Sequence, residues 1–144
     1  MSIWWSLQLR RDAASVPLAR RLLLGTMETA GVDPEVSYDL SVALTEACAN
    51  AVEHGGGRSS GAYRVTAYLD GEKCRIEVTD SGPGFTRAAH VQPPEEAEHG
   101  RGLFLIQELA DHVHFTNRPG RGGAVVSFDK ILKWRDNAPL MTAS

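Results

Sequence analysis

Apolar and polar residues alternate along several short stretches of the chain, which is the pattern of half-buried β-strands. These stretches cover residues 3–11, 63–69, 75–80, 112–117 and 123–130. Asp70 and Gly71 separate the second stretch from the third, and Asp-Gly is a strong signal for a tight hairpin turn. The last two stretches predict a second hairpin around the Gly-rich sequence between them.

Two longer stretches instead carry apolar residues at helical spacing. The first follows Ser15, which we expect to cap a helix that stops at Gly31. The second has Asp33 as its N-cap and Pro34 in its first turn, and it runs to about Glu53. Because both stretches keep one apolar side, the two helices are expected to pack on the sheet.

The remaining segments are less regular. Residues 81–101 combine Gly, Pro and acidic residues without a period, so they predict a long loop of the kind that forms functional lids or stays disordered. A short helix is expected over residues 102–110, and residues 131–144 are expected to form a tail. The order of elements predicts an α+β fold, a two-layer sandwich in which helices cover one face of a mixed, mostly antiparallel sheet. We expect one domain over residues 1–144, with its core at about 5–130.

Composition narrows the classes of function. The chain has 144 residues and a net charge of −3, which argues against a general nucleic-acid binder. Its apolar runs fall far short of the ~18 residues that span a membrane, and its first residues lack the features of a secretory signal. Cys48 and Cys74 form neither a disulfide framework nor a zinc motif, so we expect a reduced, cytoplasmic protein.

The second helix carries the first candidate chemistry. Its geometry places several polar residues in a narrow arc beside an apolar stripe of Leu40, Leu44, Ala47 and Ala51; the polar set is Asp39, Glu46, Asn50 and Glu53. Asn offers a neutral oxygen to Mg²⁺, and a carboxylate one turn away can accept a proton from an attacking hydroxyl or water. Taken alone, the same pattern is typical of a solvated helix face.

Glycines supply the other candidates. Asp80 closes a strand and is followed by Gly82 and Gly84, which by themselves are typical of a plain turn. Gly100 and Gly102 precede the expected third helix, where free backbone N–H groups suit a phosphate, although a Gly-rich hinge has the same composition. Neither a Walker A loop nor a GxGxxG dinucleotide fingerprint is present at these glycines.

In this order and spacing, the segments resemble the N, G1, G2 and G3 boxes of the GHKL ATP-binding superfamily. The boxes correspond to residues 46–55, 80–85, 100–103 and 120–124. The form of the boxes looks most like that of the anti-sigma-factor serine kinases of bacterial partner-switching systems. The resemblance extends over roughly residues 5 to 130.

The resemblance implies the Bergerat ATP-binding fold, with ATP or ADP and Mg²⁺ as ligands. It implies that Glu46 is the catalytic base, that Asn50 holds Mg²⁺, and that Asp80 accepts a hydrogen bond from the adenine amino group. The residues implied in nucleotide binding are Asn50, Asp80, Gly82, Gly84, Phe85, Gly100, Arg101, Gly102, Leu103, Gly123 and Ala124.

The resemblance further implies an anti-sigma factor with serine/threonine protein kinase activity. Such a protein sequesters a sigma factor and phosphorylates an anti-anti-sigma antagonist of the STAS type. Family members commonly form homodimers, and the apolar strand at residues 3–9 is the expected interface. No contact with nucleic acid or membrane is implied.

Two departures from the family pattern keep other functions open. Ala124 stands where many members have Thr or Ser, and acidic residues that include Glu98 stand where related kinases often carry Arg. Arg87 or Arg101 can supply the missing positive charge. The alternative is a nucleotide-gated regulatory binding module of the same fold without effective kinase activity, and a third possibility is a structural domain that binds no nucleotide.

Overall fold

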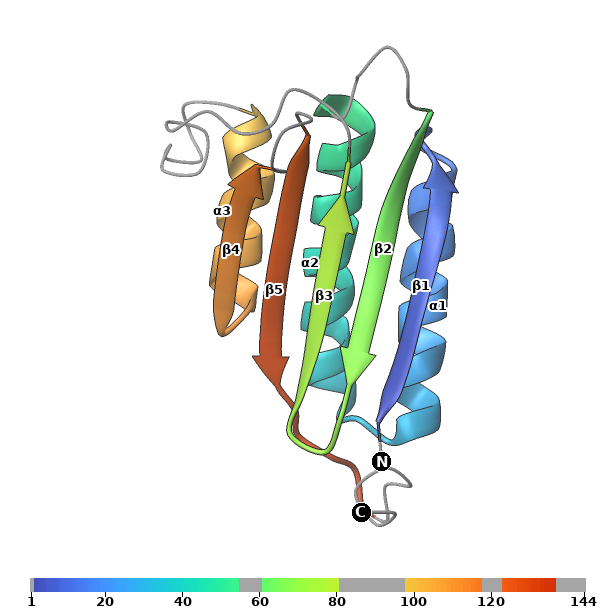
Figure 1. Ribbon diagram of the computed structural model, residues 1–144. Coiled ribbons are helices and arrows are strands. Elements are labelled where there is room, and N and C mark those ends of the chain that lie inside the picture. The colour runs from blue at the N-terminus through green and yellow to red at the C-terminus, as the bar shows by residue number, and fades with distance from the viewer. Residues whose placement is uncertain (1, 55–60, 81–97, 118–122, 137–144) are drawn as a thin grey trace.

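The computed structural model describes residues 2–54, 61–80, 98–117 and 123–136 (Figure 1). Within these ranges a five-stranded sheet has the strand order β1-β2-β3-β5-β4. The elements are β1 (Ile3–Arg10), α1 (Ser15–Ala30), α2 (Pro34–His54), β2 (Ala62–Leu69), β3 (Lys73–Thr79), α3 (Glu98–Leu109), β4 (His112–Asn117) and β5 (Ala124–Ile131).

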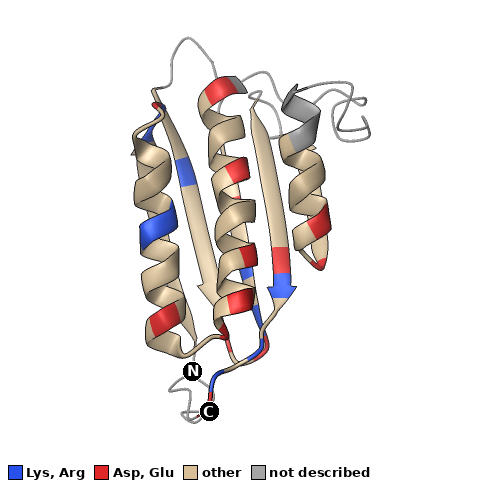
Figure 2. Cartoon of the chain, turned by 180° about the vertical axis from the view of Figure 1, so that it is seen from behind, with Lys and Arg blue, Asp and Glu red and all other residues tan. Residues whose placement is uncertain are grey.

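The helices form one layer behind the sheet, and α2 lies between α1 and α3 (Figures 1 and 2). The predicted α+β two-layer sandwich is therefore confirmed. Every pairing between the described strands is antiparallel, so the expectation of a mixed sheet was wrong in that detail. The reason is that β2–β3 and β4–β5 are hairpins, and β1 and β5 also run antiparallel to their inner neighbours.

The core lies between the two layers. Alternate strand residues such as Val65, Ile76 and Phe128 point toward the helices and are buried. Leu23 on α1 and Leu44 on α2 are also fully buried against the sheet. Burial of these apolar side chains is the main stabilising contribution to the fold.

Most helix ends agree with the sequence prediction. The Glu35 N–H donates a hydrogen bond to Asp33 Oδ1 at 2.8 Å, which confirms the cap of α2. Gly31 ends α1 in the left-handed conformation, with φ 92°, as expected of a C-capping glycine. Ser15 is not the cap of α1: it is the first helical residue, and its buried Oγ lies 2.6 Å from the Tyr63 hydroxyl.

Two boundaries differ from the prediction. The helix expected to start at Gly102 begins at Glu98, because glycines such as Gly100 weaken a helix by only about 1 kcal/mol each and do not break it. The expected tail begins too early, because Leu132 is buried in the core and Trp134 bridges to Val32. Of that tail, residues 137–144 lie outside the described residues. No helix within the described ranges is both long and apolar enough to cross a membrane.

Candidate functional site

The predicted site residues that the structure describes gather at one end of the sheet, opposite the two chain termini (Figure 1). The C-terminal end of α2, the end of β3 and the starts of α3 and β5 all lie there. Segments that are far apart in the sequence are therefore brought together. The described residues of the four boxes therefore share one end of the sheet.

Acidic residues follow one side of α2, on the side nearer α3 (Figure 2). The apolar stripe predicted beside them is buried, as Leu44 and Ala47 show with no exposed surface. Glu46 and Asn50 are both half-buried, and the helical rise of 1.5 Å per residue separates them by about 6 Å along the axis. A carboxylate and an amide oxygen therefore point from one helix toward the same region.

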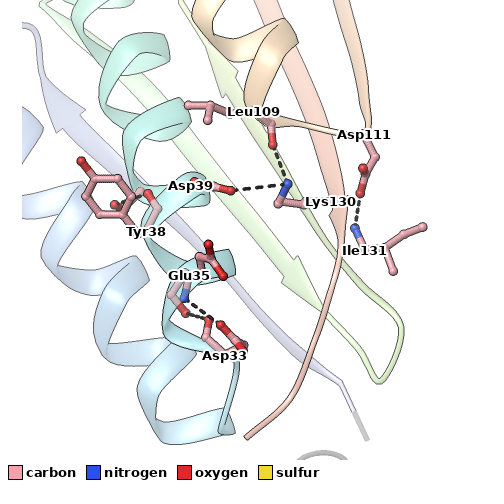
Figure 3. Close-up of polar contacts among 10 residues, drawn as sticks. Asp33, Glu35, Tyr38, Asp39, Leu109, Asp111, Lys130 and Ile131 are labelled. Carbon is pink, nitrogen blue, oxygen red and sulfur yellow. Dashed lines mark hydrogen bonds and ion pairs between the residues drawn. The ribbon is translucent and has the colours of Figure 1, made fainter.

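Asp39 belongs to a different arrangement, although it shares this side of α2. Its Oδ2 lies 3.8 Å from Lys130 Nζ, and the same ammonium donates a hydrogen bond to the Leu109 carbonyl at 2.7 Å (Figure 3). Lys130 thus connects β5, α2 and the C-terminal end of α3, where a positive charge also suits the helix dipole. The role of Lys130 was not predicted from the sequence, because no neighbouring residue in the chain indicates which helices lie near it.

Glu46 meets the start of α3. A Cβ at Gly102 would lie only 3.1 Å from Glu46 Oε2, so the Glu46 carboxylate faces this position of α3. The first N–H groups of a helix have no acceptor within the helix, and Gly100 belongs to this first turn of α3. Gly102 and Leu103 are the fifth and sixth residues of α3, so their N–H groups bond within the helix and the expected free N–H group at Gly102 is a wrong prediction. The Leu103 side chain is buried at 3% exposure. The structure therefore places a carboxylate beside a helix N-terminus.

Asp80 and Ala124 join the ends of β3 and β5. The Asp80 N–H donates to the Ala124 carbonyl at 2.9 Å, and the Ala124 N–H donates to Asp80 Oδ1 at 3.2 Å. Both residues are buried, and Gly123 has a φ of 105°, which favours glycine. A carboxylate has several acceptor positions, so Asp80 can accept a further donor from a ligand.

A buried cluster of Ser15, Cys48 and Tyr63 joins α1, α2 and β2. Burial raises the pKa of the Cys48 thiol to about 12, although a hydrogen bond with Tyr63 opposes the shift. Burial likewise raises the pKa of Tyr63, whose hydroxyl lies beside Ser15. Cys48 therefore stays protonated, which agrees with its predicted place in the core.

Some predicted site residues lie outside the described part of the chain, and others are described by their backbone alone. Gly82, Gly84, Phe85, Arg87 and the first three residues of the fourth box lie outside the described residues. Gly100 and Arg101 belong to α3 by their backbone. Among the residues that the structure describes, no three His, Cys, Asp or Glu side chains form a cluster suited to a metal ion.

Comparisons with known proteins agree with this arrangement. The sequence model of the histidine kinase-like ATPase domain family matches residues 9–130 of this chain. The serine-protein kinase RsbW of Listeria innocua is 34% identical over 119 residues, which cover 75% of this chain and 76% of that protein. The anti-sigma F factor of a Thermoanaerobacter species is 30% identical over 104 residues, which cover 67% of this chain and 73% of that protein.

Solved structures show the same fold. The RsbU and RsbW domains of Rv1364c from Mycobacterium tuberculosis superpose with a TM-score of 0.70 at 22% identity, covering 91% of this chain and 33% of that one. The catalytic domain of the histidine kinase ThkA superposes with a TM-score of 0.57 at 15% identity, covering 91% of this chain and 99% of that domain. The family predicted from the sequence boxes is confirmed, and the chain belongs to the histidine kinase-like ATPase domain family, with the RsbW serine-protein kinases among its relatives.

Proposed function

We propose that this protein is an ATP-binding anti-sigma factor with serine/threonine protein kinase activity. It sequesters a sigma factor and phosphorylates a small anti-anti-sigma antagonist of the STAS type. The observation that carries the proposal is the position of Glu46, beside the start of α3 and one helical turn before Asn50. The names of the relatives, serine-protein kinase RsbW and anti-sigma F factor, support the same function.

The residues at this end of the sheet offer partners for the adenine and the phosphates of ATP. Asp80 is a buried acceptor between β3 and β5, which suits the amino group of adenine. The start of α3 offers backbone N–H groups and the positive end of a helix dipole to the phosphates. Asn50 offers an oxygen to Mg²⁺, which would neutralise phosphate charge when bound.

Transfer requires a base for the attacking hydroxyl. The serine oxygen of the antagonist bonds to the terminal phosphorus of ATP, the bond from that phosphorus to the bridging oxygen breaks, and ADP leaves. Glu46 accepts the proton of the serine hydroxyl. A positioned base of this kind contributes about 10²–10⁴-fold to the rate.

We also propose a homodimer through the edge strand β1. Within the described sheet β1 pairs only with β2, and Trp4 on this strand is 65% exposed. Leu18 and Leu22 on the neighbouring α1 are exposed as well. Exposed apolar edge strands tend to pair with another chain. Sedimentation at increasing concentration tests the dimer, and a protein that stays monomeric at high concentration contradicts it.

The alternative function is a nucleotide-gated binding module without effective transfer. Ala124 favours it, because its buried methyl group stands where many family members have a hydroxyl. A partner captured from cells with and without ATP, then incubated with [γ-³²P]ATP and Mg²⁺, separates the two functions. The kinase predicts labelled phosphoserine on the small antagonist. ATP-dependent partner binding without any label contradicts the kinase and favours the binding module.

A further inference from the structure

Gly102 lies close to a side chain of another helix, unlike Gly25, Gly61 and Gly71. A Cβ atom at Gly102 would have three atoms of Glu46 as its nearest neighbours: Oε2 at 3.1 Å, Cδ at 3.9 Å and Cβ at 4.0 Å. Gly25, Gly61 and Gly71 meet nothing within 4 Å. A methyl group at Gly102 would therefore require the Glu46 side chain to shift by a few tenths of an ångström.

The backbone does not explain this glycine. Among the described glycines a positive φ occurs only at Gly31 and Gly123, so Gly102 has a helical conformation that any residue adopts. Glycine inside a helix is less favourable than alanine, because it loses more conformational freedom on folding. The nearby Glu46 side chain offers a physical reason for a glycine at this position of α3.

We infer that Gly102 is a positioning residue for Glu46: its bare Cα lets α3 approach α2 closely enough to fix the carboxylate of the base. The inference rests on the proposed kinase function. A half-buried glutamate with no neighbour at its tip samples several rotamers. Close packing of α3 on one side of the carboxylate limits the directions from which it can receive a proton.

The other end of α3 is also fastened to α2. Lys130 Nζ donates to the Leu109 carbonyl at 2.7 Å and lies 3.8 Å from Asp39 Oδ2 (Figure 3). This contact holds the C-terminal end of α3 beside α2, while Gly102 and Glu46 meet near its N-terminal end. Near Gly102 the helix is fixed by the buried side chains of Leu103 and Ile106, whereas Glu46 Oε2 is the end of a flexible side chain. A methyl group added at Gly102 therefore displaces the carboxylate rather than the whole helix.

The test is Gly102→Ala, compared with Gly25→Ala as the matched control. Both changes add one methyl group to a helical glycine, but only Gly102 has a neighbour in its way. A misplacement of 1 Å in a catalytic group costs about 10²-fold, so a shift of about half that distance costs roughly tenfold. We expect Gly102→Ala to lower the transfer rate about tenfold with Mg·ATP affinity within about twofold, and Gly25→Ala to leave both unchanged.

Combining Gly102→Ala with the shorter acid Glu46→Asp tests whether Gly102 acts through the position of the carboxylate or through the general stability of the fold. Glu46→Asp withdraws the carboxylate by one methylene, so it relieves the contact that Gly102→Ala creates. We expect the double variant to be at least about threefold faster than the product of the two single effects predicts, since residues in contact do not act independently. A Gly102→Ala variant that folds poorly should likewise regain its unfolding midpoint when Glu46→Asp is added.

Additive effects on rate overturn the inference, as does a Gly102→Ala variant with the wild-type rate. A loss of Mg·ATP affinity as large as the loss of rate also overturns it, because Gly102 would then serve the nucleotide. Wild-type protein that binds Mg·ATP but phosphorylates no partner contradicts the proposed function instead. In that case thermal unfolding of the wild type, the two single variants and the double variant still tests the contact. Non-additive changes in the unfolding midpoint support the contact, and additive changes contradict it.

Discussion

Replacement of Asp80 by asparagine separates two roles of its carboxylate. Oδ1 accepts the Ala124 N–H at 3.2 Å and so joins β3 to β5. The proposed second role is to accept the amino group of adenine. Asp80→Asn keeps one carbonyl oxygen for Ala124, but it can place an amide NH₂ where the nucleotide requires an acceptor.

The expected magnitudes follow from these bonds. Asp80→Ala leaves the buried Ala124 N–H without its acceptor, which lowers the free energy of unfolding by about 1–3 kcal/mol, whereas Asp80→Asn lowers it by no more than about 1 kcal/mol. A hydrogen bond to a charged group contributes about 1.5–3 kcal/mol. At about 1.4 kcal/mol per tenfold, Asp80→Asn should weaken ATP binding by about 10–150-fold.

The assay is a nucleotide titration of the wild type and both variants, accompanied by urea denaturation of each. ATP and ADP should lose affinity equally, because the change acts on the base that they share. Inosine triphosphate, which presents a carbonyl in place of the amino group, should bind Asp80→Asn better than it binds the wild type. Unchanged ATP affinity in Asp80→Asn, or a loss confined to ATP, refutes the assignment of Asp80 to adenine.

The remaining predictions concern the metal, one helix and the buried thiols. Asn50→Ala should remove most of the Mg²⁺ dependence of ATP binding in a calorimetric titration, and an unchanged dependence contradicts its role. Gly25→Ala should raise the free energy of unfolding in urea by about 0.5–1 kcal/mol, since its Cβ meets open space, and destabilisation contradicts this. Burial raises the pKa of Cys48 and Cys74 from 9.0 to about 12, so both thiols should resist labelling at pH 8 in the native protein. The pKa of the Cys48 thiol is higher in the folded than in the unfolded protein, so deprotonation favours unfolding. The free energy of unfolding should therefore be unaffected by this thiol below pH 9.0 and should decrease above it, which unfolding measured as a function of pH tests.

Local signals in the sequence predicted most of the elements. Asp33, Pro34 and Gly31 mark helix ends through capping chemistry that depends on near neighbours in the chain. Asp70 and Gly71 likewise mark the turn between β2 and β3. These predictions were correct because neighbouring residues suffice to determine such turns and caps.

Features that depend on packing were not predictable in this way. The contact between Glu46 and Gly102 joins residues of two helices whose relative position is set by the whole core. The role of Lys130 has the same origin, because its two partners belong to α2 and α3.

The central claim is that Glu46 is the base of a phosphoryl transfer reaction at this end of the sheet. Its most direct test is the single-turnover transfer rate from Mg·ATP to the antagonist for the wild type and for Glu46→Gln, with ATP affinity measured in parallel. Glu46→Gln keeps the shape of the side chain, so ATP affinity should remain and the rate should decrease by about 10²–10⁴-fold. Equal rates in the two proteins would contradict the role of Glu46.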